Sequence, residues 1–169
     1  MRPTKTELAA YLDDLDSGAA DPREGLPDPV FQFVLKTTPM INVDLLVRDA
    51  LGRVLVAWRS DEFGEGWHIP GGIIRWRESF AARLAAVGRL ELHAEVAPDP
   101  DPCRVSQLLE SGRGHFISLL YCCELRTPIP TDALAADASD TRPGQLLWSS
   151  GVPAALYPAH EIYRDLFVA

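Results

Sequence analysis

The sequence of 169 residues is poor in cysteine and has no long apolar run. Its three cysteines are Cys103 and the adjacent pair Cys122 and Cys123, with no Cys-x-x-Cys spacing. This pattern argues against a disulfide scaffold or a cysteine zinc site, and we expect buried free thiols. The longest mostly apolar run, residues 116–123, is far too short to cross a bilayer, so we expect no membrane partner.

A secretory signal is also missing, because residues 1–20 lack the basic-then-apolar order of one. We therefore expect a cytoplasmic protein. The net charge of −8 argues against a long nucleic acid as partner, although it leaves room for a small phosphorylated substrate.

Lysine is scarce, with only Lys5 and Lys36 among 16 basic residues. Arginine suits bidentate recognition of phosphate, although a general arginine bias of the source would give the same composition. Five arginines gather on and around the stretch from residue 66 to residue 95: Arg59, Arg75, Arg77, Arg83 and Arg89.

The composition, 47% hydrophobic and 24% charged, is that of one globular domain with a single core. Before it, residues 1–27 form an extension. Thr4 to Glu7 has the form of a capping box and predicts a short helix, and residues 17–29 are rich in Gly, Asp and Pro, as in a linker. The extension either packs on the domain of residues 28–169 or serves as an arm that binds a partner.

Residues 66–95 combine a Gly-rich loop with a helix that carries glutamates, a pattern that suggests a metal held against a phosphate. Pro70-Gly71-Gly72 predicts a tight loop, and a helix is expected over residues 78–93. Phe80, Leu84 and Val87 form a stripe at helical spacing, and its extension by one turn reaches Glu91. A carboxylate in that row needs a cation or strong donors, unless the end of the helix lies in water.

The remaining segments predict an α+β domain. Residues 41–47 and 53–59 suggest one hairpin, and residues 103–110 and 115–125 a second hairpin closed at residues 111–114. Residues 127–144 predict a long loop, residues 145–149 a short strand and residues 158–167 a terminal helix. The order of strands, helix, strands and helix fits a layered domain.

Gly72, Glu78 and Glu91 match the spacing of the box of the Nudix hydrolases, which this stretch resembles. The departures from that box are Ala86, Val87, Leu90 and His93, which stand where the box has Arg, Glu, Glu and Gly. The resemblance implies the Nudix fold, an α/β/α sandwich with a mixed central sheet.

Within this superfamily the chain looks most like the GDP-mannose mannosyl hydrolase branch, which also lacks two of the box glutamates. The resemblance covers about residues 30–168. It includes Thr38-Pro39, Val43-Asp44, Ala57-Trp58-Arg59, residues 66–72, Glu91-Leu92, His115 and Trp148. It implies a nucleoside diphosphate sugar as substrate, one Mg²⁺ ion, and a homodimer.

The degenerate box limits the metal site, because Val87 and Leu90 cannot bind an ion. One Mg²⁺ ion, with Mn²⁺ as an alternative, is expected on Glu91, on a backbone carbonyl of Gly71 or Gly72, and on substrate diphosphate oxygens. Glu78 either orients the metal shell or favours the helix N-terminus through the helix dipole.

By resemblance, Arg59 matches an arginine on the diphosphate and Asp44 a carboxylate near the sugar. For Asp44 a solvated position on an edge strand stays an alternative. Arg75 is a further candidate for substrate binding. Trp76 is a candidate stacking platform for base or sugar, with simple packing as its alternative.

The general base is the missing part, since Arg142-Pro143 stand where the resembling sequences carry a Gln-His pair. Asp140 and His115 are the candidates to replace it, although a strand histidine such as His115 is often structural. Asp137 and His93 are further substitutes.

Three hypotheses follow. The first is a Mg²⁺-dependent enzyme that releases nucleoside diphosphate from a nucleotide sugar. The second is a pyrophosphohydrolase of another nucleoside diphosphate derivative, using other carboxylates such as Glu95. The third is a nucleotide-binding Nudix domain without turnover.

Overall fold

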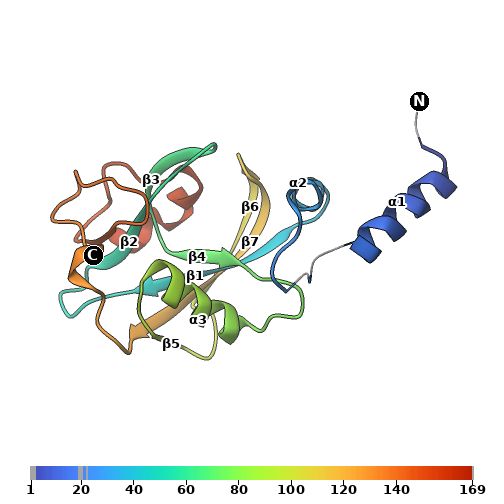
Figure 1. Ribbon diagram of the computed structural model, residues 1–169. Helices are drawn as coiled ribbons and strands as arrows, with labels where there is room; N and C mark the ends of the chain where they lie inside the picture. The colour runs from blue at the N-terminus through green and yellow to red at the C-terminus, as the bar shows by residue number, and fades with distance from the viewer. Residues whose placement is uncertain (1–2, 19–20, 22, 169) are drawn as a thin grey trace.

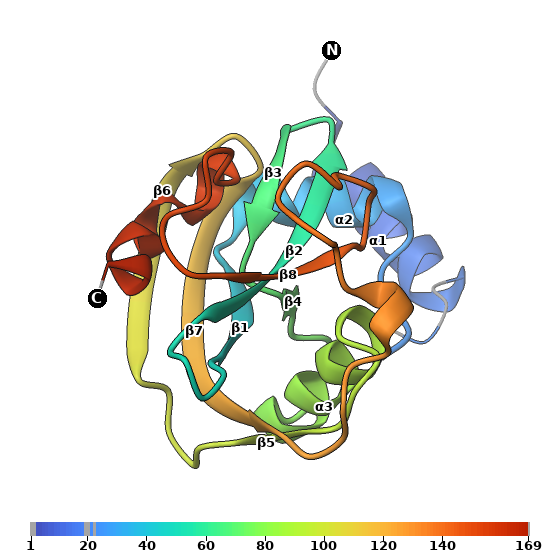
Figure 2. The ribbon, with the colours of Figure 1, turned by 90° about the vertical axis from the view of Figure 1, so that its left-hand side faces the viewer.

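A computed structural model describes residues 3–18, 21 and 23–168. Two β-sheets with helices around them form the body of the molecule (Figures 1 and 2). The elements are α1 (Lys5–Gly18), α2 (Asp28–Thr37), β1 (Met40–Val47), β2 (Val54–Asp61), β3 (Gly64–His68), β4 (Gly71–Ile73), α3 (Phe80–Glu91), β5 (Val96–Pro98), β6 (Arg104–Ser111), β7 (Gly114–Leu125), η1 (Thr131–Ala133), β8 (Leu146–Ser149) and η2 (Pro158–Phe167).

The larger sheet is mixed. Its strand order is β4-β1-β7-β5, and β6 also pairs with β7. The pair β1 and β7 is parallel, from Met40 opposite Phe116 to Val47 opposite Cys123, whereas the pairings of β4, β5 and β6 are antiparallel. The smaller sheet, β3-β2-β8, is antiparallel. The predicted α+β class with a mixed sheet is confirmed.

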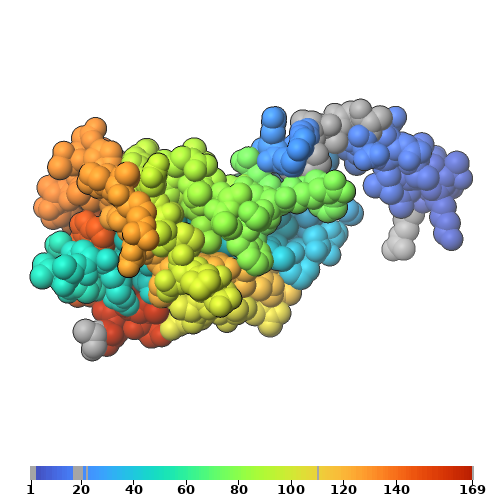
Figure 3. Space-filling model, turned by 90° about the horizontal axis from the view of Figure 1, so that it is seen from below, coloured from blue at the N-terminus to red at the C-terminus, as the bar shows by residue number. Residues whose placement is uncertain are grey.

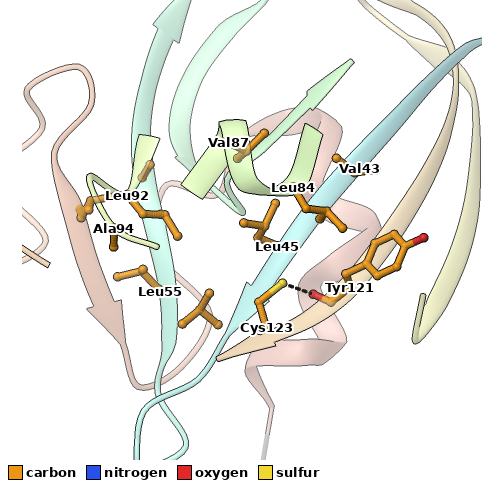
Figure 4. Close-up of a cluster of buried hydrophobic side chains, with 12 residues drawn as sticks. Val43, Leu45, Leu55, Leu84, Val87, Leu92, Ala94, Tyr121 and Cys123 are labelled. Atoms are coloured by element: carbon orange, nitrogen blue, oxygen red, sulfur yellow. Dashed lines mark hydrogen bonds between the residues drawn. The ribbon is translucent and has the colours of Figure 1, made fainter. Parts of the chain in front are cut away.

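Alternation along β1 places successive side chains on opposite faces of the sheet. Val43, Leu45 and Val47 are buried on the face that α3 covers, where they join Leu84 and Val87 in one apolar cluster. Figure 4 shows Leu84 and Val87 of α3 in one cluster with Val43 and Leu45 of β1.

A second apolar cluster lies against η2. Leu46 of β1 and Trp58 of β2 pack there with Tyr163 and Phe167 of η2. The strands therefore lie between α3 and η2, which is the predicted α/β/α layering. The terminal helix itself is 3-10 rather than α-helical.

Helix α3 is shorter than predicted. Ser79 is its N-cap and accepts a hydrogen bond from the Ala82 amide (3.1 Å), so Glu78 lies before the helix. The predicted buried stripe is confirmed for Leu84 and Val87, which are buried, and wrong for Phe80, which is 48% exposed.

Two local predictions were wrong. The strands β1 and β2 do not form a hairpin, because they belong to different sheets and meet only at a bridge between Arg48 and Val54. Long-range pairing supplies the neighbours of β1 instead. Gly71 and Gly72, expected with Pro70 in a tight loop, belong to the edge strand β4. The hairpin of β6 and β7 and the strand β8 are confirmed.

The capping box of the extension is confirmed: the Thr4 amide donates to Glu7 Oε2 (2.8 Å), and the Glu7 amide donates to Thr4 Oγ1 (3.2 Å). Helix α1 projects from the body, as Figures 1 and 3 show. One side of it carries apolar side chains that are 48–65% exposed: Leu8, Tyr11, Leu12 and Leu15.

No helix in the part of the chain that the structure describes is long and apolar enough to span a membrane. The expectation of buried thiols holds in part, because Cys123 is buried and Cys122 half-buried whereas Cys103 is exposed.

His93 stands where the Nudix box has glycine, and its φ of +52° lies in the left-handed region. This conformation costs a residue with a side chain about 1–2 kcal/mol relative to glycine. We expect His93→Gly to raise the free energy of unfolding by about 1 kcal/mol, measured by urea denaturation. His93→Ala is the control, since alanine keeps the unfavourable φ. Equal stabilities of the two variants would contradict this explanation.

Candidate active site

A cleft of about 360 Å³ opens between the two sheets. Strands β1 to β4, the end of α3, the hairpin of β6 and β7, and η2 all contribute to its wall. Of the predicted site residues, the cleft brings together Asp44, Arg59, Gly71, Gly72, Arg75 and Glu91.

Asp44 is buried on β1, a central strand of the larger sheet, so the alternative of a solvated edge position is wrong. Its Oδ1 accepts a hydrogen bond from Asn42 Nδ2 (2.7 Å). Its Oδ2 accepts from Tyr163 Oη (2.7 Å) and from Ser118 Oγ. Burial raises the pKa of Asp44 to about 6, and these hydrogen bonds oppose the rise.

Asp44 also explains the glycine opposite it. A Cβ at Gly71 would lie 2.0 Å from Asp44 Oδ1 and 2.7 Å from the Val43 carbonyl oxygen, so no other residue fits there. The requirement is close approach of the backbone, in an extended strand rather than a turn.

The two predicted backbone ligands differ in orientation. The Leu45 amide donates to the Pro70 carbonyl (2.8 Å), and Gly72 lies opposite Val43 in the same ladder. Because hydrogen-bonded positions alternate along an antiparallel pair, the Gly72 carbonyl faces β1 whereas the Gly71 carbonyl faces away from it, off the sheet edge. Gly71 is therefore the better candidate for binding an ion.

Glu91 has an oxygen without a partner. Its Oε2 is buried and accepts no hydrogen bond from the described residues, and it lies 3.4 Å from His68 Nε2. An uncompensated buried carboxylate oxygen fits a bound cation. The wall of the cleft at Glu91 is thus suited to one metal ion.

Glu78 is compensated by protein donors instead. Its Oε2 accepts hydrogen bonds from the Arg75 amide (2.9 Å) and from Arg83 Nε (2.8 Å). It lies outside the wall of the cleft, while Arg83, which is 6% exposed, contributes to that wall. Among the described residues no group of three His, Cys, Asp or Glu side chains could hold a metal, so the donor set does not fit a cage of several ions.

Two arginines, Arg59 and Arg113, line part of the cleft. Arg59 binds Asp61 through Nε (2.6 Å) and lies over the Tyr157 ring, with its Cζ 5.3 Å from the centroid. Arg113 Nε is buried and unpaired among the described residues. Burial, and next the charge of Arg59, lower the pKa of Arg113. An anion between the two guanidinium groups would relieve both effects.

Arg113 lies between two aromatic rings. Its Cζ is 5.7 Å from the centroids of both Phe63 and Phe116. Arg113 was not among the site residues predicted from the sequence, because it lies in a hairpin loop rather than near the Gly-rich stretch.

The cleft also contains two histidines that were not predicted as site residues. His160 Nδ1 accepts a hydrogen bond from the Ile69 amide (3.2 Å), and burial lowers the pKa of His160 well below its usual value. It is therefore a neutral imidazole whose Nε2 carries the proton. A signal for His68 was its place two residues before Pro70-Gly71-Gly72, whereas only folding brings His160 of η2 beside it.

Four predicted residues lie elsewhere. His115 borders a separate depression and contacts Gln107 (3.1 Å). Asp140 lies in the loop after η1 and pairs with Arg142 (2.8 Å). Trp76 is 60% exposed, outside the wall of the cleft and beneath the Arg77 guanidinium. Glu78, as described above, pairs with Arg83.

Solved structures with the same arrangement define the class of the fold. A MutT Nudix hydrolase from Burkholderia pseudomallei matches with a TM-score of 0.59 at 18% identity, over 78% of this chain and 99% of that one. A MutT protein from Methanosarcina mazei Go1 matches with a TM-score of 0.58 at 20% identity, over 78% and 92%. The chain has the Nudix hydrolase fold.

A UDP-X diphosphatase overlaps with nearly the whole chain, over 95% of this chain and 75% of that one, at a TM-score of 0.57 and 13% identity. By sequence the chain is similar to the low-salt glycan biosynthesis protein Agl8 of Haloferax volcanii, with 31% identity over 84 residues. That match spans 49% of this chain and about half of the relative, 53%. No family profile matches the chain.

The raised pKa of Asp44 predicts a pH-dependent stability. Between its ordinary pKa of 3.8 and the folded value of about 6, the folded state binds more protons than the unfolded state, so stability falls as the pH rises. As the pH rises through this window, we expect the free energy of unfolding of wild type to fall by up to about 3 kcal/mol relative to that of Asp44→Asn, because asparagine cannot ionise. Urea denaturation in EDTA at a series of pH values measures this difference. A difference that does not change with pH would contradict the assignment.

Proposed function

We propose that the protein is a Nudix-fold hydrolase that acts on a nucleoside diphosphate sugar, such as GDP-mannose, with one divalent metal ion. The observation that carries this proposal is that one cleft contains both a cationic group and a carboxylate oxygen that lack hydrogen-bond partners among the described residues. Among the described residues, Arg113 Nε and Glu91 Oε2 have no hydrogen-bond partner, and both side chains line the cleft together with Arg59. A diphosphate with a bound cation would supply a partner to each, because its oxygens accept from the arginine and its cation binds the carboxylate.

One ion is proposed rather than several, because Arg83 neutralises Glu78 and leaves Glu91 as the uncompensated carboxylate. Glu91 and the Gly71 carbonyl would hold Mg²⁺ or Mn²⁺ together with substrate oxygens. When bound, the ion would act as a Lewis acid that stabilises the departing diphosphate.

The residues of the chain have separate roles in this proposal. Arg59 and Arg113 bind the diphosphate, with Arg75 at the rim of the cleft. Asp44, fixed by Asn42 and Tyr163, accepts a proton from the attacking water or a sugar hydroxyl, for which a carboxylate pKa raised toward neutrality is suited. Substitution at the sugar C1 then releases the nucleoside diphosphate.

The similarities support an enzyme of this class. Solved structures with the same fold are hydrolases, and one of them is named for UDP derivatives. A role of the archaeal relative in glycan biosynthesis is compatible with a nucleotide-sugar substrate here. The overlap with the UDP-X diphosphatase favours, as second candidate, cleavage of the diphosphate itself.

The bond that breaks can be read from the products. The protein is incubated with GDP-mannose or UDP-sugars and Mg²⁺ or Mn²⁺ in H₂¹⁸O, and products are identified by mass spectrometry. Nucleoside diphosphate with ¹⁸O in the free sugar is the expected result. Nucleoside monophosphate and sugar phosphate carrying ¹⁸O would instead establish the second candidate. Nucleotide binding without turnover would overturn both.

Glu91→Gln removes the charge of the proposed metal ligand at nearly constant shape. We expect metal-dependent turnover to fall at least about a hundredfold, because a neutral amide is a weak ligand for a hard cation. Steady-state kinetics at several metal concentrations measure this loss. Unchanged turnover would remove Glu91 from the site.

Arg113→Gln tests the diphosphate end of the cleft. We expect KM for the nucleotide sugar to rise about tenfold or more, because a charge-assisted contact with phosphate contributes about 1.5–3 kcal/mol. Arg164→Gln is the matched control, since Arg164 is exposed and pairs with Glu161 on η2. Equal KM values for both variants would contradict the assignment of Arg113.

A further inference from the structure

His68 and Glu91 come from distant parts of the chain and face each other in the cleft. His68 is the last residue of β3 and 7% exposed, and Glu91 is the last residue of α3. The distance from His68 Nε2 to Glu91 Oε2 is 3.4 Å. This is longer than the roughly 2.7–2.9 Å of a charge-assisted hydrogen bond.

The other ring nitrogen of His68, Nδ1, has a backbone partner. His68 Nδ1 lies 2.8 Å from the Ala57 carbonyl oxygen, which can only accept, so Nδ1 carries a proton. Nε2 is then the ring atom that lies toward Glu91 Oε2, an oxygen that accepts no hydrogen bond among the described residues. A ring nitrogen and a carboxylate oxygen at this distance can both bind one cation.

We propose that His68 Nε2 and Glu91 Oε2 together bind the divalent metal ion, which makes His68 a metal ligand. An ion about 2.1 Å from both atoms, which are 3.4 Å apart, would have them about 108° apart, close to the angle of a tetrahedral site. The contact between Nδ1–H and the Ala57 carbonyl fixes the ring, as is usual for a histidine that binds metal.

The ligand set also indicates the class of the ion. Imidazole nitrogen suits Fe²⁺, Ni²⁺ and Zn²⁺, whereas carboxylate, carbonyl and water oxygens suit Mg²⁺ and Mn²⁺, so a site with both kinds of ligand admits Zn²⁺ as well as Mn²⁺. The described residues contain no third His, Cys, Asp or Glu to complete a cluster, so backbone oxygen, water and substrate fill the other positions. Such an open site suits an ion that also contacts the substrate.

This inference rests on the proposed function only in taking Glu91 as a metal ligand, and it is tested without substrate. Mn²⁺ is titrated into the full chain and followed by electron paramagnetic resonance, and pulsed measurements detect coupling to imidazole ¹⁴N. We expect coupling in wild type, its loss in His68→Gln, and a Kd for Mn²⁺ that is about tenfold or more higher in that variant. His115→Gln is the matched control and should keep the coupling.

A second measurement uses the wild-type chain, in case His68→Gln does not fold. With ¹⁵N-labelled histidine and Zn²⁺, imidazole spectra of the four histidines should show one ring, protonated at Nδ1, whose Nε2 resonance shifts on binding. Metal bound without histidine nitrogen, or no metal bound at all, would overturn the inference. Nucleotide-sugar turnover with an all-oxygen metal site would overturn it and leave the proposed function standing. Coordination by His68 without turnover of any nucleotide sugar would support the inference and overturn the proposed function.

Discussion

A carboxylate buried in the middle of the larger sheet constrains much of the structure around the cleft. Asp44 lies on the central strand β1 and receives hydrogen bonds from Asn42, Ser118 and Tyr163, which come from three different elements. Its oxygen leaves no room for a side chain at Gly71, so β4 passes close beside it. One buried polar group thereby fixes the spacing of β1 and β4 and the position of η2, because leaving it without donors would be costly.

Charge compensation decides which glutamate is available for chemistry. The two glutamates that match the Nudix box, Glu78 and Glu91, are alike in sequence but differ in the folded chain. Arg83, one turn into α3, neutralises Glu78, whereas Glu91 faces the imidazole of His68. Of these two glutamates, only Glu91 has a buried carboxylate oxygen that accepts no hydrogen bond from the described residues, and the proposed single cation rests on that difference.

The absence of a matching family profile and the clear match in fold have a common explanation. The fold depends on the alternation of β1 and on the apolar face of α3, which many sequences satisfy. The residues of the Nudix box serve chemistry instead, and this sequence has other residues at several of the corresponding positions. Its cleft contains other polar groups, His68, Arg113 and His160, from segments outside the box helix. Function has to be argued from these groups rather than from the fold.

The sequence by itself determined the α+β class, the capping box of α1 and the hairpin of β6 and β7. These features depend on local periodicity and turn residues, which are encoded by neighbours in the chain. The resemblance to the Nudix hydrolases made Asp44, Arg59, Gly71 and Glu91 candidates for the site. Only the tertiary structure decided that β1 and β2 separate into two sheets, that Glu78 pairs with Arg83, and that His68, Arg113 and His160 share one cleft. These features arise from contacts between segments that are distant in the sequence. Neither the spacing of residues nor the composition predicts which distant segments will contact each other.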